Sequence, residues 1–371
     1  MRNTNPYAGI NWEKSHRIHT STHNHVTKPE SLACTLAKGY ELLTISNYYP
    51  SKPYYPLSSV KVNTFACSQE HGVLHNGKFE EGPINWNEVI SQWEDELTEE
   101  ERGNFPFKEG EPLFPPLPEG ILEAPNAEHH SFTDCDLIME RGLHITAPGS
   151  LWASGHFATA GRYGLKAHGY TPGAGIPWRE AFRKILDNLL WEEGGGIIIN
   201  HPTHTQCIFQ FLLDALDFDD RVLGLEVWNT TLSSEGVWDS VLRTGRQCFG
   251  FFVPDHFNKL SRMYNPMNIL LTEERTARAC MKAYREGAFY GCLLNTGLGF
   301  EKISFEGDTL TVQTNKEAFI EVIGFPGVLA YARGKEIKYT LAMKKEAVVF
   351  LRVRAFDETG ERIFSQPIIL P

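Results

Sequence analysis

Short apolar segments alternate with amphipathic helices over the first 300 residues, and this alternation constrains the fold more than any other feature. The clearest unit is a helix predicted from Pro177 to Glu193, whose apolar residues recur on one face. Gly194-Gly195-Gly196 ends it, and Ile197-Ile198-Ile199 follows as a strand that is apolar on both faces. Further strands are predicted at 42–46, 223–228 and 248–253, and further helices at 29–38 and 272–287. Such repeated units indicate a parallel sheet, either open or closed into a barrel.

From about residue 301 the pattern changes to an alternation of apolar and polar side chains. Seven short strands are predicted between 302 and 370, separated by turns such as Gly307-Asp308 and Thr359-Gly360. This pattern predicts an all-β, sandwich-like domain at 301–371, after an α/β domain at 1–300.

Acidic side chains gather in one segment of the chain. The 371 residues include 35 Lys and Arg against 46 Asp and Glu, a net charge of −11, and 81–125 hold 12 acidic and 2 basic residues. Six prolines lie within 104–125. We interpret 81–125 as an acidic, proline-rich insertion over the surface, either a solvated loop or a lid or oligomer contact. An acidic chain is also a poor non-specific nucleic-acid binder.

Several other classes of protein are disfavoured. No apolar run approaches the ~20 residues that cross a bilayer, and the polar N-terminal residues lack a signal core. Seven cysteines include no CxxC pair, which favours reduced thiols in a cytoplasmic protein without a membrane partner. There is no GxSxG elbow, GxxxxGK[ST] loop or GxGxxG following a strand.

All 14 histidines lie between His16 and His256, which suggests one functional unit. The strand at 197–200 leads directly into His201, and the strand at 248–253 leads into Asp255 and His256. Active sites of parallel α/β folds lie beyond the carboxyl ends of the strands. Imidazoles and carboxylates together suit zinc, iron or manganese, so we expect a metal site at these strand ends.

Two more groups could complete this site. His19, His23 and His25 lie close together near the N-terminus, and residues i and i+2 of a strand share a face, so His23 and His25 could bind one ion. Glu128 and His144 form a second possible pair of ligands on neighbouring predicted strands. We expect His168 and His204 to approach a small-molecule substrate rather than the metal.

The order of these motifs resembles the PHP (polymerase and histidinol phosphatase) superfamily. Its His-x-His motif aligns either with His19 and Ser21 or with His23 and His25; Glu128, His144, His201-Pro202 and Asp255-His256 match the later motifs. The resemblance implies a distorted (β/α)7 TIM-like barrel with a small C-terminal β domain. It also implies a phosphoesterase in which a metal-bound hydroxide attacks phosphorus, with Glu128 and Asp255 as negatively charged ligands.

The sequence also departs from the family pattern. Asn47-Tyr48 stands where the family has Asp-His, and Asp255 and His256 are adjacent rather than one residue apart. We therefore expect one or two divalent ions (Zn, Mn or Fe) rather than three. A degenerate barrel that binds a ligand such as a carbohydrate, or a metal-dependent hydrolase of a non-phosphate substrate, stays open as an alternative. The sequence does not predict the oligomeric state.

Overall fold

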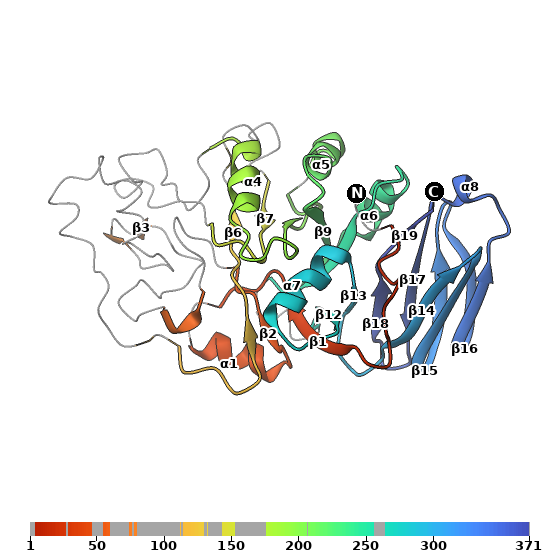
Figure 1. Cartoon of the computed structure of the whole chain (residues 1–371), viewed down its shortest axis with the longest axis horizontal. Coiled ribbons are helices and arrows are strands. Elements are labelled where there is room, and N and C mark those ends of the chain that lie inside the picture. Colours follow the sequence, from red (N-terminus) through yellow and green to blue (C-terminus); the bar gives the residue numbers. More distant parts are fainter. Residues whose placement is uncertain are drawn as a thin grey trace. The chain divides into compact units, whose positions relative to one another are not determined.

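The chain is a mixed α/β protein, seen here in a computed structural model (Figure 1). The structure describes residues 4–26, 29–46, 55–59, 74–75, 78–79, 112, 114–129, 132, 143–152, 176–205, 207–255 and 264–370. Contacts divide the chain into two compact units. Unit 1 comprises Met1–Ser21, His201–His204 and Ile208–Pro371, and unit 2 comprises Thr22–Asn200 and Thr205–Cys207.

Unit 2 has short strands and two α-helices among its described residues. Its helices are α1 (Pro29–Ala37), the 3-10 helix Leu57–Ser59 and α4 (Trp178–Asp187). Its strands are β2 (Leu42–Leu43), β3 (Leu74–His75), β4 (Lys78–Phe79), β5 (Leu122–Glu123), β6 (Glu128–His129), β7 (Ile145–Thr146) and β8 (Ile197–Ile199). β2 and β5 are parallel, whereas β6–β7 and β7–β8 are antiparallel pairs.

Helix α4 forms where the apolar spacing predicts it and buries the expected face. Trp178, Phe182 and Ile185 are each at most 2% exposed. The helix ends at Asp187 rather than near Glu193, because the chain then pairs with residues 149–151: Leu190 N–H donates to Gly149 O at 2.8 Å. This core supports β8, the strand that leads to Asn200.

The segment predicted as a surface insertion contributes to the frame of unit 2 at its C-terminal end. Leu122 N–H donates to Glu41 O at 2.8 Å and Ala124 N–H to Leu43 O at 3.0 Å, which places β5 beside β2. The last residues of the predicted insertion therefore pair with β2. Of the rest of 81–125, only residues 112 and 114–121 are described.

Unit 1 contains the other long elements. Its helices are α5 (Phe209–Leu216), α6 (Glu235–Leu242), α7 (Ala277–Glu286) and α8 (Lys345–Val348). Its strands before residue 300 are β1 (His16–Ser21), β9 (Val222–Asn229), β10 (Leu232–Ser233), β11 (Phe249–Val253), β12 (Met267–Thr272) and β13 (Phe289–Cys292). β9 and β11 are parallel with α6 between them in sequence, so this βαβ unit confirms the expected alternation locally.

Not all the strands are parallel, which corrects the prediction of a parallel sheet. β12 is antiparallel to both β1 and β13. Helix α7 ends at Gly287, whose φ of 74° is easily adopted only by glycine, and the chain turns back against β12 at once. The described pairing therefore does not establish a closed TIM-like barrel.

The C-terminal segment is β-rich, as predicted, but with fewer and longer strands. They are β14 (Phe300–Glu306), β15 (Thr309–Ile323), β16 (Val328–Thr340), β17 (Phe350–Phe356), β18 (Arg362–Ser365) and β19 (Ile368–Ile369). β15 and β16 each span two predicted strands. Between the predicted strands the chain makes no turn, and the pairing of β15 with β16 continues after a shift in register. β18 pairs with β13, so these strands continue the sheet of unit 1. The two-layer sandwich and the boundary at residue 300 stay predictions.

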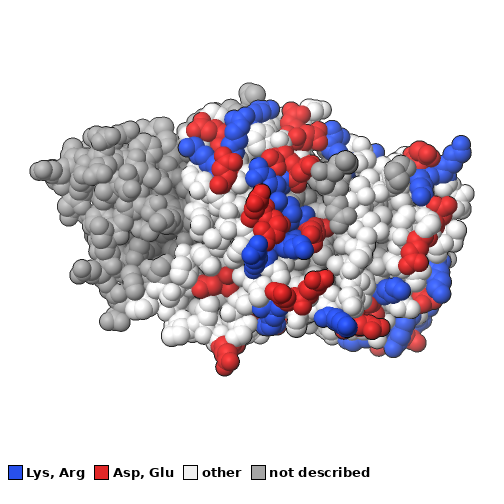
Figure 2. Space-filling model, viewed as in Figure 1, with Lys and Arg blue, Asp and Glu red and all other residues white. Residues whose placement is uncertain are grey.

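Charged side chains of both signs are mixed on the described part of the face seen in Figure 2. The described part of the chain also contains the ion pairs Arg221–Asp219 at 2.9 Å and Arg246–Asp217 at 2.7 Å. Within the described ranges, no helix has both the length and the apolarity needed to cross a membrane. The five cysteines that the structure describes are all free thiols.

Candidate metal centre

Ser46 connects the two segments that carry the first site residues of unit 2. Asn24 N–H donates to Ser46 Oγ at 2.9 Å, and Ser46 N–H donates to Asn24 O at 3.1 Å. Glu128 N–H in turn donates to Ser46 O at 3.0 Å. These backbone contacts fix His23 and His25, on either side of Asn24, against the first residue of β6.

Three ligand-type atoms converge in this unit. Nε2 of His23 lies 2.9 Å from Nε2 of His25, and Oε2 of Glu128 lies 3.2 Å from the first nitrogen and 3.1 Å from the second. His23 is fully buried, Glu128 is 3% exposed and His25 is 7% exposed. The two histidines and the carboxylate thus form a buried cluster of metal-ligand side chains.

Two neutral imidazoles leave one unfavourable contact in this triangle. A neutral imidazole nitrogen either donates one proton or accepts one. In one arrangement both Nε2 atoms donate to Oε2 of Glu128, and their N–H groups then face each other. In the other arrangement one imidazole donates to the other, and a nitrogen lone pair then faces the negatively charged carboxylate. A cation that accepts a lone pair from all three atoms removes the conflict. Tetrahedral zinc bonds of ~2.0–2.2 Å place ligand atoms about 3.3 Å apart, close to the observed distances.

The second carboxylate oxygen of Glu128 is held separately. Nδ1 of His144 lies 3.1 Å from Oε1, and Asn200 Nδ2 donates to the same oxygen at 3.1 Å. Asn200 is itself oriented, because Thr146 Oγ1 donates to its Oδ1 at 3.1 Å. Glu128 is therefore fixed in rotation, with one oxygen toward His23 and His25 and the other toward His144.

Unit 1 contains a second polar network, built at the carboxyl ends of β9 and β11. Oε2 of Glu226, a residue 1% exposed, accepts from His201 N–H and from Asn229 Nδ2, both at 2.8 Å. Asn229 Nδ2 also donates to Asp255 Oδ2 at 3.1 Å. Glu226 and Asn229 therefore orient His201 and Asp255, two of the predicted ligands.

The backbone of this network is strained. His201, Thr230 and Asp255 have positive φ values of 25°, 51° and 56°, which residues other than glycine rarely adopt. Thr230 is held there by two bonds, from its N–H to Val253 O at 3.0 Å and from its Oγ1 to Pro254 O at 2.7 Å. Such conformations cluster at functional sites, where the surrounding structure maintains them.

The remaining predicted residues are distributed as follows. His19 lies half-buried on β1 in unit 1, opposite Ile269 of β12. His204 contacts His201 with an edge-on ring arrangement at 5.5 Å. Predicted residues His168 and His256, and the departure at Asn47-Tyr48, lie outside the described residues. Ser46 and Asn200 were not predicted as site residues; the only available signal was their position at strand ends.

His129, the residue next to Glu128, is also buried from solvent. Its ring stacks on Trp152 at 5.3 Å and is fully buried. Burial lowers the pKa of His129 to about 3, although the charge of Glu128 acts in the opposite direction. This histidine is therefore neutral near pH 7 and adds no positive charge beside the carboxylate.

Comparisons with known proteins include a distant similarity to a solved structure. No protein-family model matches the chain, and no curated protein matches it. A solved two-domain protein from Bacteroides vulgatus, which contains a predicted PHP-like metal-dependent phosphoesterase, aligns with 99% of this chain and 91% of its own. The identity is 10% and the TM-score is 0.41, too low to establish a shared fold.

Proposed function

We propose that the chain is a metal-dependent hydrolase, and specifically a phosphoesterase. The observation that supports this most is the convergence of His23, His25 and Glu128, whose ligand-type atoms lie 2.9, 3.2 and 3.1 Å apart and would suit a divalent cation. These three residues would hold a divalent ion, with His144 beside the other oxygen of Glu128. His19, His201, Asp255 and His256 stay predicted ligands on the strength of their sequence motifs.

A bound divalent ion would lower the pKa of a water molecule toward neutrality and would offset negative charge on a phosphoryl oxygen. The protein's own residues would do the rest. Burial of His23 and Glu128 keeps bulk water from competing for the ligand atoms, and Asn200 prevents rotation of the carboxylate. Asp255, which Asn229 orients, would be the second catalytic carboxylate after Glu128. His168 and His204 would bind the substrate.

The finer fold belongs to the same proposal. The βαβ unit of β9, α6 and β11 supports a distorted (β/α)7 barrel, with the C-terminal strands as an appended β domain. Four further points stay predictions from the sequence: the protein binds one or two ions, acts on a small-molecule substrate, has no nucleic-acid partner and is cytoplasmic.

The test combines metal analysis with substrate profiling. Protein purified without added metal is analysed for Zn, Mn and Fe, then assayed on phosphate monoesters, diesters and amides before and after chelation and metal replacement. We expect stoichiometric metal and phosphoester hydrolysis that chelation abolishes. Stoichiometric metal without hydrolysis of any phosphoester would refute the phosphoesterase, and amide hydrolysis alone would favour a carbon-centred substrate.

A binding protein without turnover is the second candidate. The departure at Asn47-Tyr48 favours it, because these residues stand where the family has Asp-His, which would remove one or two metal ligands. Absence of bound metal at neutral pH, even after incubation with Zn or Mn, would support this class over the hydrolase.

A further inference from the structure

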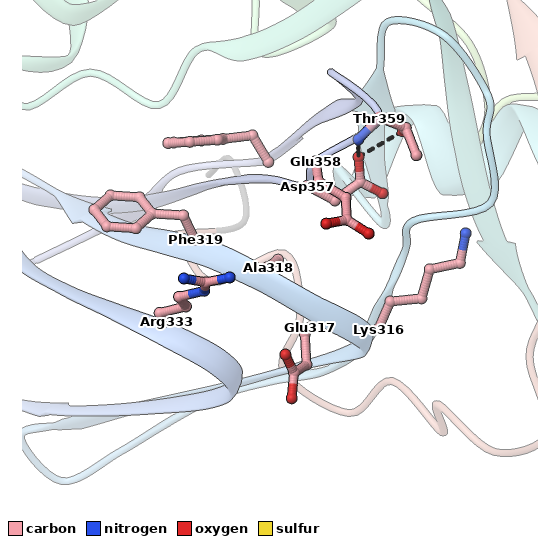
Figure 3. A pocket seen from close by; sticks show the side chains of 9 residues that line it. Lys316, Glu317, Ala318, Phe319, Arg333, Asp357, Glu358 and Thr359 are labelled. Carbon is pink, nitrogen blue, oxygen red and sulfur yellow. Dashed lines mark hydrogen bonds between the residues drawn. The ribbon is translucent and has the colours of Figure 1, made fainter.

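A hollow of about 600 Å³ lies on the C-terminal strands of unit 1 (Figure 3). It is lined by residues 316–319, Arg333 and residues 356–359. This volume falls in the ~300–1,000 Å³ range of sites that hold small ligands. The hollow uses none of the residues of the candidate metal centre.

Aromatic rings form the floor of this hollow and continue beyond it. The strand register places Phe356 and Arg333 on either side of Phe319, across β17, β15 and β16. The ring centroids of Phe319 and Phe356 are 5.0 Å apart, and Tyr331 stacks on Phe319 at 5.5 Å with an interplanar angle of 20°. Tyr331 is 70% exposed. The three rings therefore make a partly exposed strip rather than a closed core.

Charged groups border the strip, and several have no partner within the described structure. Among the described residues, no hydrogen bond or ion pair engages the side chains of Glu317, Arg333 or Glu358. Lys316 extends away, and its Nζ donates to Thr296 O at 2.9 Å. Asp357 accepts from Thr359 N–H at 2.9 Å, which leaves its second oxygen on the rim. Hydrogen-bonding groups of both kinds thus lie beside an apolar floor.

The charge balance selects among ligands. Three carboxylates, those of Glu317, Asp357 and Glu358, border the hollow against two cations, Arg333 and Lys316, which leaves the rim with a net negative charge. A phosphate, sulfate or carboxylate group would be repelled, and a purely apolar ligand would leave the charged rim desolvated. A pyranose ring satisfies both requirements: its C–H face packs on the negative face of an aromatic ring, and its hydroxyls donate to carboxylates and accept from a guanidinium.

We propose that this strip, formed by Phe319, Tyr331 and Phe356 with its rim of Arg333 and carboxylates, binds a neutral oligosaccharide. Tyr331 covers Phe319, and because Tyr331 is itself 70% exposed, its outer face is available for stacking by a sugar ring. The inference is independent of the metal centre.

The test measures binding to the full chain by calorimetry. The probes are cellohexaose, xylohexaose, maltohexaose and a wider array of neutral glycans, with a heparin oligosaccharide and choline as charged probes. We expect at least one neutral glycan to bind at millimolar concentration or below, equally well before and after chelation. Tyr331→Ala should weaken this binding about tenfold, and Tyr331→Phe should retain it.

Matched variants keep the result interpretable. Glu358→Gln, on an exposed residue, should also weaken binding, whereas Phe209→Ala removes a ring that is 40% exposed on α5 and should change nothing. Melting curves verify that each variant is folded. Binding of heparin or choline in place of neutral glycans, no glycan binding at all, or full binding by Tyr331→Ala would overturn the proposal.

Discussion

Oε2 of Glu128 lies 3.2 Å from Nε2 of His23, although the two residues are far apart in sequence, and both side chains are at least 97% buried. A carboxylate in such a place is costly unless it is paired or binds a cation. The same oxygen also faces His25 at 3.1 Å, so a single proton on His23 does not satisfy the site. Metal binding should therefore depend on this one carboxylate more than on any other group in unit 2.

We predict that Glu128→Gln strongly weakens metal binding while preserving the fold. The amide has nearly the same shape, but it lacks the negative charge and presents an N–H₂ group to one set of neighbours. The apparent Kd for Zn or Mn should rise by more than the ~10–100-fold that follows loss of an outer partner of a ligand. Competition with a chromophoric chelator measures the change.

Glu123→Gln is the matched control for this variant. Glu123 lies on β5 in the same unit, and its Oε2 accepts from Leu57 N–H at 3.0 Å, away from the three converging ligands. Its substitution should leave the Kd for metal unchanged. Equal affinity in wild type and Glu128→Gln would contradict the assignment of the site.

We predict that Asn200 acts as a positioning residue. Its amide donates to Oε1 of Glu128 at 3.1 Å, so Asn200→Ala should free the carboxylate to rotate and weaken metal binding about 10–100-fold. The readout is again the Kd for metal, which a purely structural role would not alter. Asn188→Ala, at an exposed helix end, serves as the control; identical Kd values for the two variants would argue against positioning.

Much of the fold follows from the sequence, and the exceptions have physical causes. The helix at Trp178 and the strand at Ile197 follow from apolar periodicity, which local burial enforces. Periodicity does not predict the relative direction of two strands. A helix between two strands can lead to a parallel or an antiparallel pair, and a glycine such as Gly287, which has a positive φ, lets the chain turn back for the antiparallel one. The antiparallel arrangement of β12 and β13 was missed for this reason.

The candidate site was predictable in its residue types more than in its contacts. The spacing of His23 and His25 indicated a shared face, and the structure brings both to Glu128, but the same motif allowed an alignment through His19. His23 and His25 are held at this place through Asn24, which lies between them and pairs with the backbone and hydroxyl of Ser46. A contact between a serine and a distant asparagine has no periodic signal, so no pattern in the sequence reveals it.

Arg352 gives a prediction about stability. Its side chain is 1% exposed, its Nε donates to Asp239 Oδ1 and its NH2 to Glu235 Oε1, both at 2.8 Å. Arg352→Met would leave two neighbouring carboxylates without this cation, and it should lower the free energy of unfolding by about 3 kcal/mol. Urea denaturation measures the change.

The neighbouring Arg354 provides the comparison. Its side chain is 28% exposed and pairs with Glu321 and Glu235. Arg354→Met should cost less than about 1 kcal/mol, because solvent screens the pair. If Arg352→Met destabilises the protein no more than Arg354→Met, the buried network does not stabilise the junction of α6 and β17.

Cys207 should be nearly unreactive in the folded protein. Burial raises the pKa of its thiol to about 12, so at pH 8 only about one molecule in 10⁴ carries the reactive thiolate. In the unfolded chain the pKa is ~8.5, so the stability that this thiol contributes is complete below pH 8.5 and is lost as the pH rises toward 12. Iodoacetamide at pH 8, followed by peptide mass spectrometry, should label Cys207 quickly in urea and very slowly without it. Equal labelling rates in the two conditions would show that the pKa of this half-buried thiol is not raised in the native protein.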